Sequence, residues 1–143
     1  MRTTRRIGAL WTLAAAALAS LATVLALPAG SGAVTQAAPA NNAEPRISGS
    51  ATVGSTLSAT QGTWTGSPTG YAYQWVRCGR DGGLPSGADC ATIGGATTTK
   101  YIVSNADVDH RLRVRVTASN SDGSKTVASN ATALVRAADA GKP

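Results

Sequence analysis

Apolar and polar residues alternate with a period of two in the second half of the chain. The clearest segment is RLRVRVTAS, in which one apolar set alternates with one polar set: Leu112, Val114, Val116 and Ala118 against Arg111, Arg113, Arg115 and Thr117. This period predicts a β-strand with one face in a hydrophobic core and the other in water. From Pro45 onward, no segment carries the apolar period of a helix over three turns.

Shorter segments alternate in the same way and predict further strands. In YAYQWVR the inward face holds three aromatic residues, Tyr71, Tyr73 and Trp75, and in TKYIVS it holds Tyr101 and Val103. TLSAT is a third segment of this kind. Several short strands separated by Gly, Asn and Asp predict an all-β sandwich or barrel.

The connections between these strands carry turn signals. Asp122-Gly123 predicts a tight hairpin turn after the long alternating strand. The returning segment, TVASNATALV, changes which parity is apolar, so a β-bulge is expected near Ser129–Asn130. SNADVDH predicts one helical turn, with Ser104 or Asn105 as its N-cap.

The N-terminal segment has the pattern of a secretory signal peptide. Three arginines in the first six residues precede an uncharged run, Ile7 to Leu27, which small residues follow. Cleavage is expected after Ala33 or Ala40. The alternative is an uncleaved membrane anchor with the domain facing outward, because 21 uncharged residues are long enough to cross a bilayer.

These features predict a secreted protein with one folded domain. Residues 1–40 are expected to be signal peptide and flexible lead-in, and the small, polar residues up to Ala43 continue that lead-in. The folded domain is expected to span 45–136, followed by a flexible tail at 137–143.

Composition and charge narrow the class of protein. Aromatic residues make up 4% of the chain, so a small domain built from it has a thin core that gains from a covalent clip. The formal charge is +6, but from Asn41 onward ten Lys and Arg stand against seven Asp and Glu, a net charge of +3. That balance is ordinary for a soluble surface, so no nucleic-acid partner is expected.

The two cysteines, Cys78 and Cys90, are best explained as a structural disulfide. A metal site needs about four ligands, and the sole histidine, His110, lies 20 residues beyond Cys90. A thioredoxin-type redox pair needs the spacing Cys-x-x-Cys, which is absent here. Because paired cysteines in a secreted chain usually form disulfides, we expect this one and no metal or other cofactor.

The order of these motifs resembles an immunoglobulin-like sandwich. Trp75 takes the place of the strand C tryptophan and Asp107 lies at the corner between strands E and F. More closely, ISGSATVGSTLSATQGTW, YAYQWVRC, ATIGGATTTKYIVSNADV and LRVRVTASNSDGS are similar to the immunoglobulin-like repeats of secreted and surface proteins from high-GC Gram-positive bacteria. The resemblance spans roughly Pro45 to Val135 and implies an antiparallel β-sandwich of about seven strands.

The chain departs from that family in two residue patterns. Antibody-type domains join strands B and F by a disulfide, whereas the inward positions here are apolar: Leu57 or Ala59, and Val114 or Val116. With Trp75 inward, parity turns Cys78 away from the core, so its disulfide is expected to brace a loop. The corner reads Asp107-Val108-Asp109 where the repeats have glycine last, although glycine tolerates a positive φ best.

Candidate sites for chemistry are few, and each has a structural alternative. His110 lacks a nucleophile-elbow sequence to act with, so no catalytic role is expected. Asp81 and Asp89 are too few for a Ca²⁺ loop and are expected in a solvated turn. Asn130-Ala131-Thr132 fits the glycosylation tripeptide or is simply part of a strand.

The aromatic residues can likewise be interpreted as a binding site or as part of the structure. Tyr71, Tyr73 and Trp75 would stack sugars if exposed, but their inward parity favours the core. Trp64, among loop residues, is expected as a lid over one end of that core.

Arg111, Arg113 and Arg115 are the remaining candidate site. Alternation predicts that they form a row on a solvated sheet face, which either aids solubility or docks an anionic cell-wall polymer. The core anchors are expected to be these residues: Trp75, Tyr73, Tyr101, Leu112, Val114 and Val116.

The function expected from the sequence is that of a non-catalytic module. It would be secreted or at the cell surface, with a structural or binding role, and its candidate partners are a cell-wall polymer, a carbohydrate or another surface protein. A membrane is a partner only if the N-terminal segment is retained. The alternatives are a small secreted inhibitor or chaperone-like protein and, last, a hydrolase.

Overall fold

A computed structural model of the chain describes residues 36–84 and 87–139, so the expected signal peptide lies outside the described residues. The described part is all-β apart from one turn of 3-10 helix, η1 (Asn105–Asp107). Its strands are β1 (Ala40–Ala43), β2 (Ile47–Ser48), β3 (Thr56–Ala59), β4 (Thr63–Thr65), β5 (Gly70–Cys78), β6 (Ala91–Thr92), β7 (Lys100–Ile102), β8 (Arg111–Asn120) and β9 (Gly123–Ala128).

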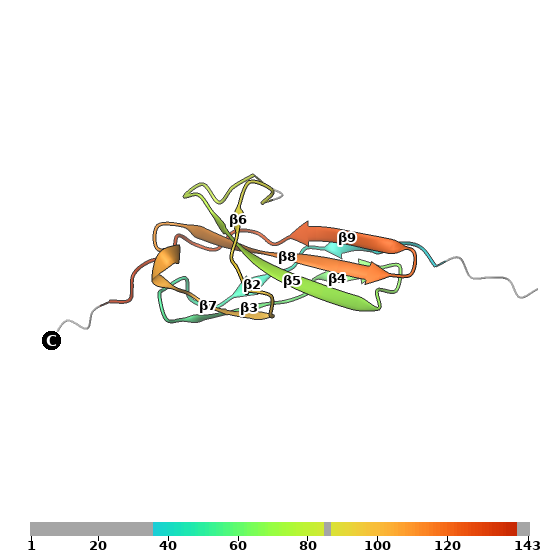
Figure 1. Cartoon of the computed structure of the whole chain (residues 1–143), viewed down its shortest axis with the longest axis horizontal. Coiled ribbons are helices and arrows are strands. Elements are labelled where there is room, and N and C mark those ends of the chain that lie inside the picture. Colours follow the sequence, from blue (N-terminus) through green and yellow to red (C-terminus); the bar gives the residue numbers. More distant parts are fainter. Residues whose placement is uncertain (1–35, 85–86, 140–143) are drawn as a thin grey trace, which may run out of the picture. The chain divides into compact units, whose positions relative to one another are not determined.

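The strands pair antiparallel in three groups. One sheet has the order β6-β5-β8-β9, a second has β2-β3-β7, and β1 pairs with β4 (Figure 1). The longest pairing runs along β5 and β8, from Gly70 opposite Ser119 to Cys78 opposite Arg111. The β6-β5-β8-β9 sheet faces the other strands across one hydrophobic core, which is a sandwich-like arrangement.

The core is built from the inward faces that the alternation predicts. Its fully buried members include Trp75 and a set of aliphatic residues: Leu57, Val103, Leu112, Val114, Val116 and Val135. Tyr73 and Tyr101 are half-buried against them. Trp75 stacks on Tyr101 with ring centroids 5.5 Å apart, and its indole N–H donates to the Thr98 carbonyl over 2.9 Å. The largest side chain of the core therefore has its one polar group satisfied.

The folded domain begins earlier than the sequence predicts. Residues expected to be flexible lead-in form β1, and Pro39, just before it, is buried. The carbonyl of Ala37 accepts a hydrogen bond from the Asn120 amide over 2.8 Å. Gly66 (φ 79°) lies so close to this segment that a Cβ there would be 2.6 Å from the Ala38 carbonyl oxygen. The last part of the expected lead-in, Ala40–Ala43, is therefore an integral strand, which its small and polar residues do not predict.

The segment that follows β9, residues 129–132, contains the extra residue that the change of parity predicts. Regular pairing with β8 ends at Ala128, opposite Arg115. Beyond it, the backbone N–H groups of Val114 and Leu112 donate to side-chain hydroxyls, those of Ser129 and Thr132. From Ser129 to Thr132 the chain advances by three residues, while β8 advances by two between the same contacts. The unmatched residue is the bulge, and the hydroxyls satisfy the backbone donors that it leaves over.

Candidate functional site

A disulfide joins Cys78 and Cys90, with an S–S distance of 2.02 Å. Cys78 lies on the face of β5 opposite to Trp75, so the bond braces the connecting loop and does not cross the core, as parity predicts. Both cysteines are buried, and together with Val76 they form a small second apolar cluster outside the main core. We call the described residues 79–84 and 87–89 the clipped loop. It lies on the side of β5 and β8 away from β3 and β7 (Figure 1).

The expectation of an exposed arginine row is wrong. Arg113 is only 7% exposed, and Arg111 and Arg115 are half-buried. Alternation places all three on the outer face of β8, but the clipped loop covers that face. The row is therefore not a free basic stripe on which a polymer could dock.

The guanidinium groups of this row bind backbone carbonyls. Arg111 donates to the Arg80 carbonyl over 2.8 Å and Arg113 to the Gly82 carbonyl over 2.8 Å. Arg115 donates to the carbonyls of Gly87 and Cys90. The other side of the row ties down the returning strand, since Arg113 also donates to Ser129 and Arg111 to Thr132. The three arginines thus hold the clipped loop to the sheet.

The clipped loop also satisfies its own polar groups. The Asp81 carboxylate accepts from the Gly83 N–H over 3.0 Å, and the Asp89 carboxylate accepts from the Leu84 N–H over 2.8 Å. Gly87 (φ 63°) packs against Arg113, and a Cβ there would be 2.9 Å from the Arg113 Cδ. Among the described residues, no group of three metal-ligating side chains is brought together. Asp81 and Asp89 therefore stabilise a turn.

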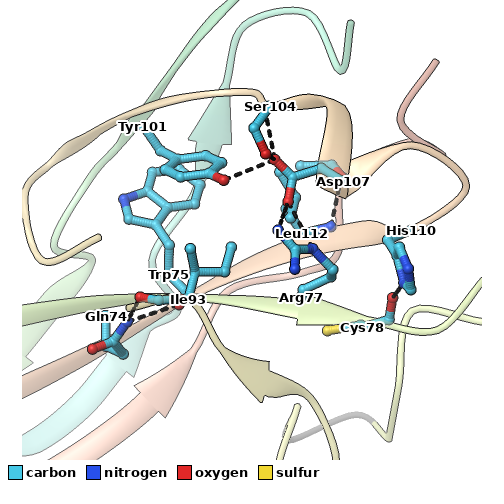
Figure 2. A network of polar contacts seen from close by, with 11 residues as sticks. Gln74, Trp75, Arg77, Cys78, Ile93, Tyr101, Ser104, Asp107, His110 and Leu112 are labelled. Carbon is cyan, nitrogen blue, oxygen red and sulfur yellow. Dashed lines mark hydrogen bonds and ion pairs between the residues drawn. The ribbon is translucent and has the colours of Figure 1, made fainter. Parts of the chain in front are cut away.

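A second polar cluster surrounds Asp107 at the end of η1 (Figure 2). This fully buried carboxylate accepts five hydrogen bonds, two from the Arg77 guanidinium, one from the Tyr101 hydroxyl, and two from the Ser104 N–H and hydroxyl. The Nε of Arg77 lies 2.8 Å from Oδ1, and the Tyr101 hydroxyl lies 2.7 Å from Oδ2. A buried charge with this many donors is compensated and links β5, β7 and η1.

The environment of this cluster shifts the pKa values of two groups. Burial alone would raise the pKa of Asp107, but the hydrogen bonds from Ser104, Tyr101 and Arg77 outweigh it and leave the pKa below its ordinary value. Burial raises the pKa of Tyr101, and its contact with Ser104 offsets only part of that rise. Asp107 is therefore held ionised, with Tyr101 as a neutral hydrogen-bond donor.

The sequence predicted part of this cluster. The helical turn with Ser104 as its N-cap is confirmed as a single 3-10 turn with a capping box. The Ser-x-x-Asp spacing of Ser104 and Asp107 is close to the capping-box pattern and could have indicated the contact between these two residues. The tie between Arg77 and Asp107 was missed because these residues are 30 positions apart. Asp109 adopts a positive φ, 65°, which glycine would tolerate best. Its carboxylate pairs with Arg80 over 2.6 Å.

The remaining candidate residues also have structural contacts. The Nδ1 of His110 lies 2.9 Å from the Cys78 carbonyl oxygen (Figure 2). Trp64 is half-buried against Tyr71 and donates its indole N–H to the Gln61 carbonyl over 2.7 Å, which suits a lid over the core. Asn130 is exposed, but the Thr132 hydroxyl of the same tripeptide accepts from the Leu112 N–H.

No protein-family model matches the chain, and neither does any curated protein. Within residues 36–84 and 87–139, no helix has the length and apolar character needed to span a bilayer.

Proposed function

We propose that the protein is a secreted or cell-surface module with an immunoglobulin-like β-sandwich and a non-catalytic structural or binding role. The observation that carries this proposal is how its reactive side chains are used. Asp107 is enclosed by five hydrogen bonds, Cys78 and Cys90 are joined, and the arginine row binds carbonyls. A catalytic group needs a free functional atom facing a substrate pocket. The functional atoms of these groups instead make contacts that stabilise the fold.

The strand order supports the immunoglobulin-like part of the proposal. β1 pairs with β4, and β2 pairs with β3. We therefore count β1 and β2 together as one interrupted strand, A, and β3 and β4 together as a second, B. β5 and β8 correspond to strands C and F, with β9 and β6 beside them as G and C′, and β7 corresponds to E. This assignment gives about seven strands, the number found in immunoglobulin-like domains.

The proposed location rests on the N-terminal pattern and on the disulfide. A basic start, an apolar run and small residues are the marks of an exported chain. A disulfide in a small domain suits an oxidising, extracellular compartment.

The test is retention of the purified mature protein by intact cells, isolated cell envelopes and a panel of envelope polymers. A binding module should be retained by envelopes and depleted from solution, with a saturable dependence on concentration. A structural spacer would be retained only as part of a larger envelope assembly. Turnover of ester, peptide or glycoside substrates that is lost in a His110→Ala variant would contradict the proposal.

A further inference from the structure

A groove follows one edge of the sandwich, between β2 and the segment that follows β9. It consists of two neighbouring hollows of about 370 and 410 Å³ that share Ala51 and Ala133. One side is formed by residues 45–52 and the other by 130–136. We call this the edge groove. It ends beside the bridge between Thr52 and Arg136, where the two sides meet.

The lining of the edge groove is positively charged. Arg46 lines the first hollow, and Arg111 and Arg136 line the second. Among the described residues that line either hollow, none carries a carboxylate. Three acids lie close to the lining in sequence: Glu44 and Asp139 are exposed and outside it, and Asp109 is paired with Arg80.

Two of these three cations have their guanidinium groups available. Within the described part of the chain, the guanidiniums of Arg46 and Arg136 make no hydrogen bond or ion pair, and both residues are exposed. Arg111 differs, because it gives two donors to the carbonyls of Arg80 and Thr132. A guanidinium carries five N–H donors, so Arg111 keeps some that are not used by those two bonds.

The uncharged lining also favours an anion. The hydroxyls of Ser50 and Thr52 lie 2.9 Å apart in the second hollow, and Asn130 and Thr132 line the first. No aromatic ring is among the lining residues, so neither hollow offers a surface on which a sugar ring could stack. A ligand here is recognised by charge and by hydrogen-bond acceptors.

We propose that the edge groove binds a polyanion whose charged groups are phosphates. Arg111 and Arg136 line the same hollow, and one guanidinium fork already fills both oxygens of a carboxylate. The phosphate at the end of such a chain has three free oxygens and up to two charges, so it can accept from both guanidiniums at once, whereas an internal phosphate has two free oxygens and one charge. Arg46, in the adjoining hollow, would bind a second group along the same chain. This proposal deepens the proposed function and rests on its binding role.

The experiment titrates the mature protein with inorganic polyphosphate and, separately, with poly-glutamate of matched charge, at about 20 and about 200 mM salt. Polyphosphate is expected to bind more tightly than poly-glutamate, and higher salt should weaken its binding because the cations are exposed. Arg136→Gln and Arg46→Gln are each expected to weaken polyphosphate binding about tenfold at low salt. Arg136→Lys keeps the charge but loses the fork, and should be intermediate.

Lys100→Gln is the matched control. It removes one positive charge from β7, at the edge of its sheet opposite to β2. An equal loss of binding in Lys100→Gln would overturn the proposal that the edge groove is the binding site, because it would mean that binding depends only on the net charge of the protein. Tighter binding of poly-glutamate would overturn the phosphate assignment. Envelope retention that persists in Arg46→Gln/Arg136→Gln would overturn the groove while leaving the proposed function standing.

Discussion

Trp75 contributes more buried surface than any other side chain of this aromatic-poor core. It is fully buried, stacked on Tyr101 and hydrogen-bonded to Thr98. We expect Trp75→Ala to lower the free energy of unfolding by about 3–5 kcal/mol, through lost burial and the cavity left behind. Urea unfolding followed by circular dichroism measures this change. Trp64→Ala, at a half-buried position, is the control and should cost less; equal costs would contradict the assignment of Trp75 as the anchor.

Asp107 is expected to make stability depend on pH in the acid range. Its pKa is lowered in the folded protein, so its contribution is complete above the ordinary pKa, 3.8. That contribution is lost as the pH falls through the lower, folded-state value. Asp107→Asn should lower the free energy of unfolding by about 3–5 kcal/mol at neutral pH, because the Arg77 charge is left without its partner.

The measurement is the melting temperature of both proteins between about pH 7 and pH 2. The difference between them should begin to shrink below about pH 4, where the carboxylate is protonated in the unfolded chain, and should continue to shrink as the pH falls through the lower pKa of the folded protein. A difference that stays constant over the whole range would mean that the charge of Asp107 does not act in this way.

At the scale of elements, the arginine row holds the clipped loop to the sheet and is not a free basic stripe. Arg113→Gln is expected to lower the free energy of unfolding by about 1–3 kcal/mol, because the carbonyls of Gly82 and Ser129 lose a charged donor. For a domain near 100 residues this corresponds to a fall of about 4–8 °C in melting temperature per kcal/mol. Differential scanning calorimetry is the measurement.

Lys125→Gln provides the comparison for Arg113, since it removes the same charge from an exposed position on β9. It should change stability by less than about 0.5 kcal/mol. If both variants melt together with the parent, the contacts of Arg113 do not hold the loop to the sheet.

The same element shows how far the sequence could predict the structure. The period of two in RLRVRV predicted which residues of β8 enter the core, because burial of one face fixes the parity of a strand. It did not predict that the other face is also covered. The sequence pattern is the same whether a row of arginines faces solvent or lies under a loop. The clipped loop is rich in Gly and Asp and has no periodic pattern that predicts which surface it packs against. The edge groove was missed for a similar reason, since Arg46 and Arg136 are 90 positions apart.

At the scale of the whole molecule, β1 decides which leader cleavage the fold tolerates. Cleavage after Ala40 would remove buried Pro39 and the Ala37 carbonyl that Asn120 binds. Cleavage after Ala33 would leave them in place. We therefore expect protein recovered from the medium to begin at Val34, which an intact mass determines directly. A mature protein that begins at Asn41 would contradict the role of the preceding residues.

Truncation tests the same point without export. Protein produced from Glu44 onward lacks β1, leaving one edge of β4 unpaired and Trp64 less covered. It should be less stable by about 2 kcal/mol or more than protein produced from Val34, on the scale of one buried apolar side chain. The urea midpoints of the two purified proteins decide the matter.

The short span of the disulfide has a consequence for how the molecule assembles. Cys78 and Cys90 are 12 positions apart, whereas Arg113 reaches Gly82 across 31. A chain segment of that shorter span meets end to end in about 10–100 ns, well before distant strands find each other. With two cysteines in the chain, oxidation has a single intramolecular product. Oxidation itself takes seconds to hours, so the two sulfurs meet many times before the bond forms. The redox chemistry of the compartment therefore sets when the loop becomes fixed and how stable the product is.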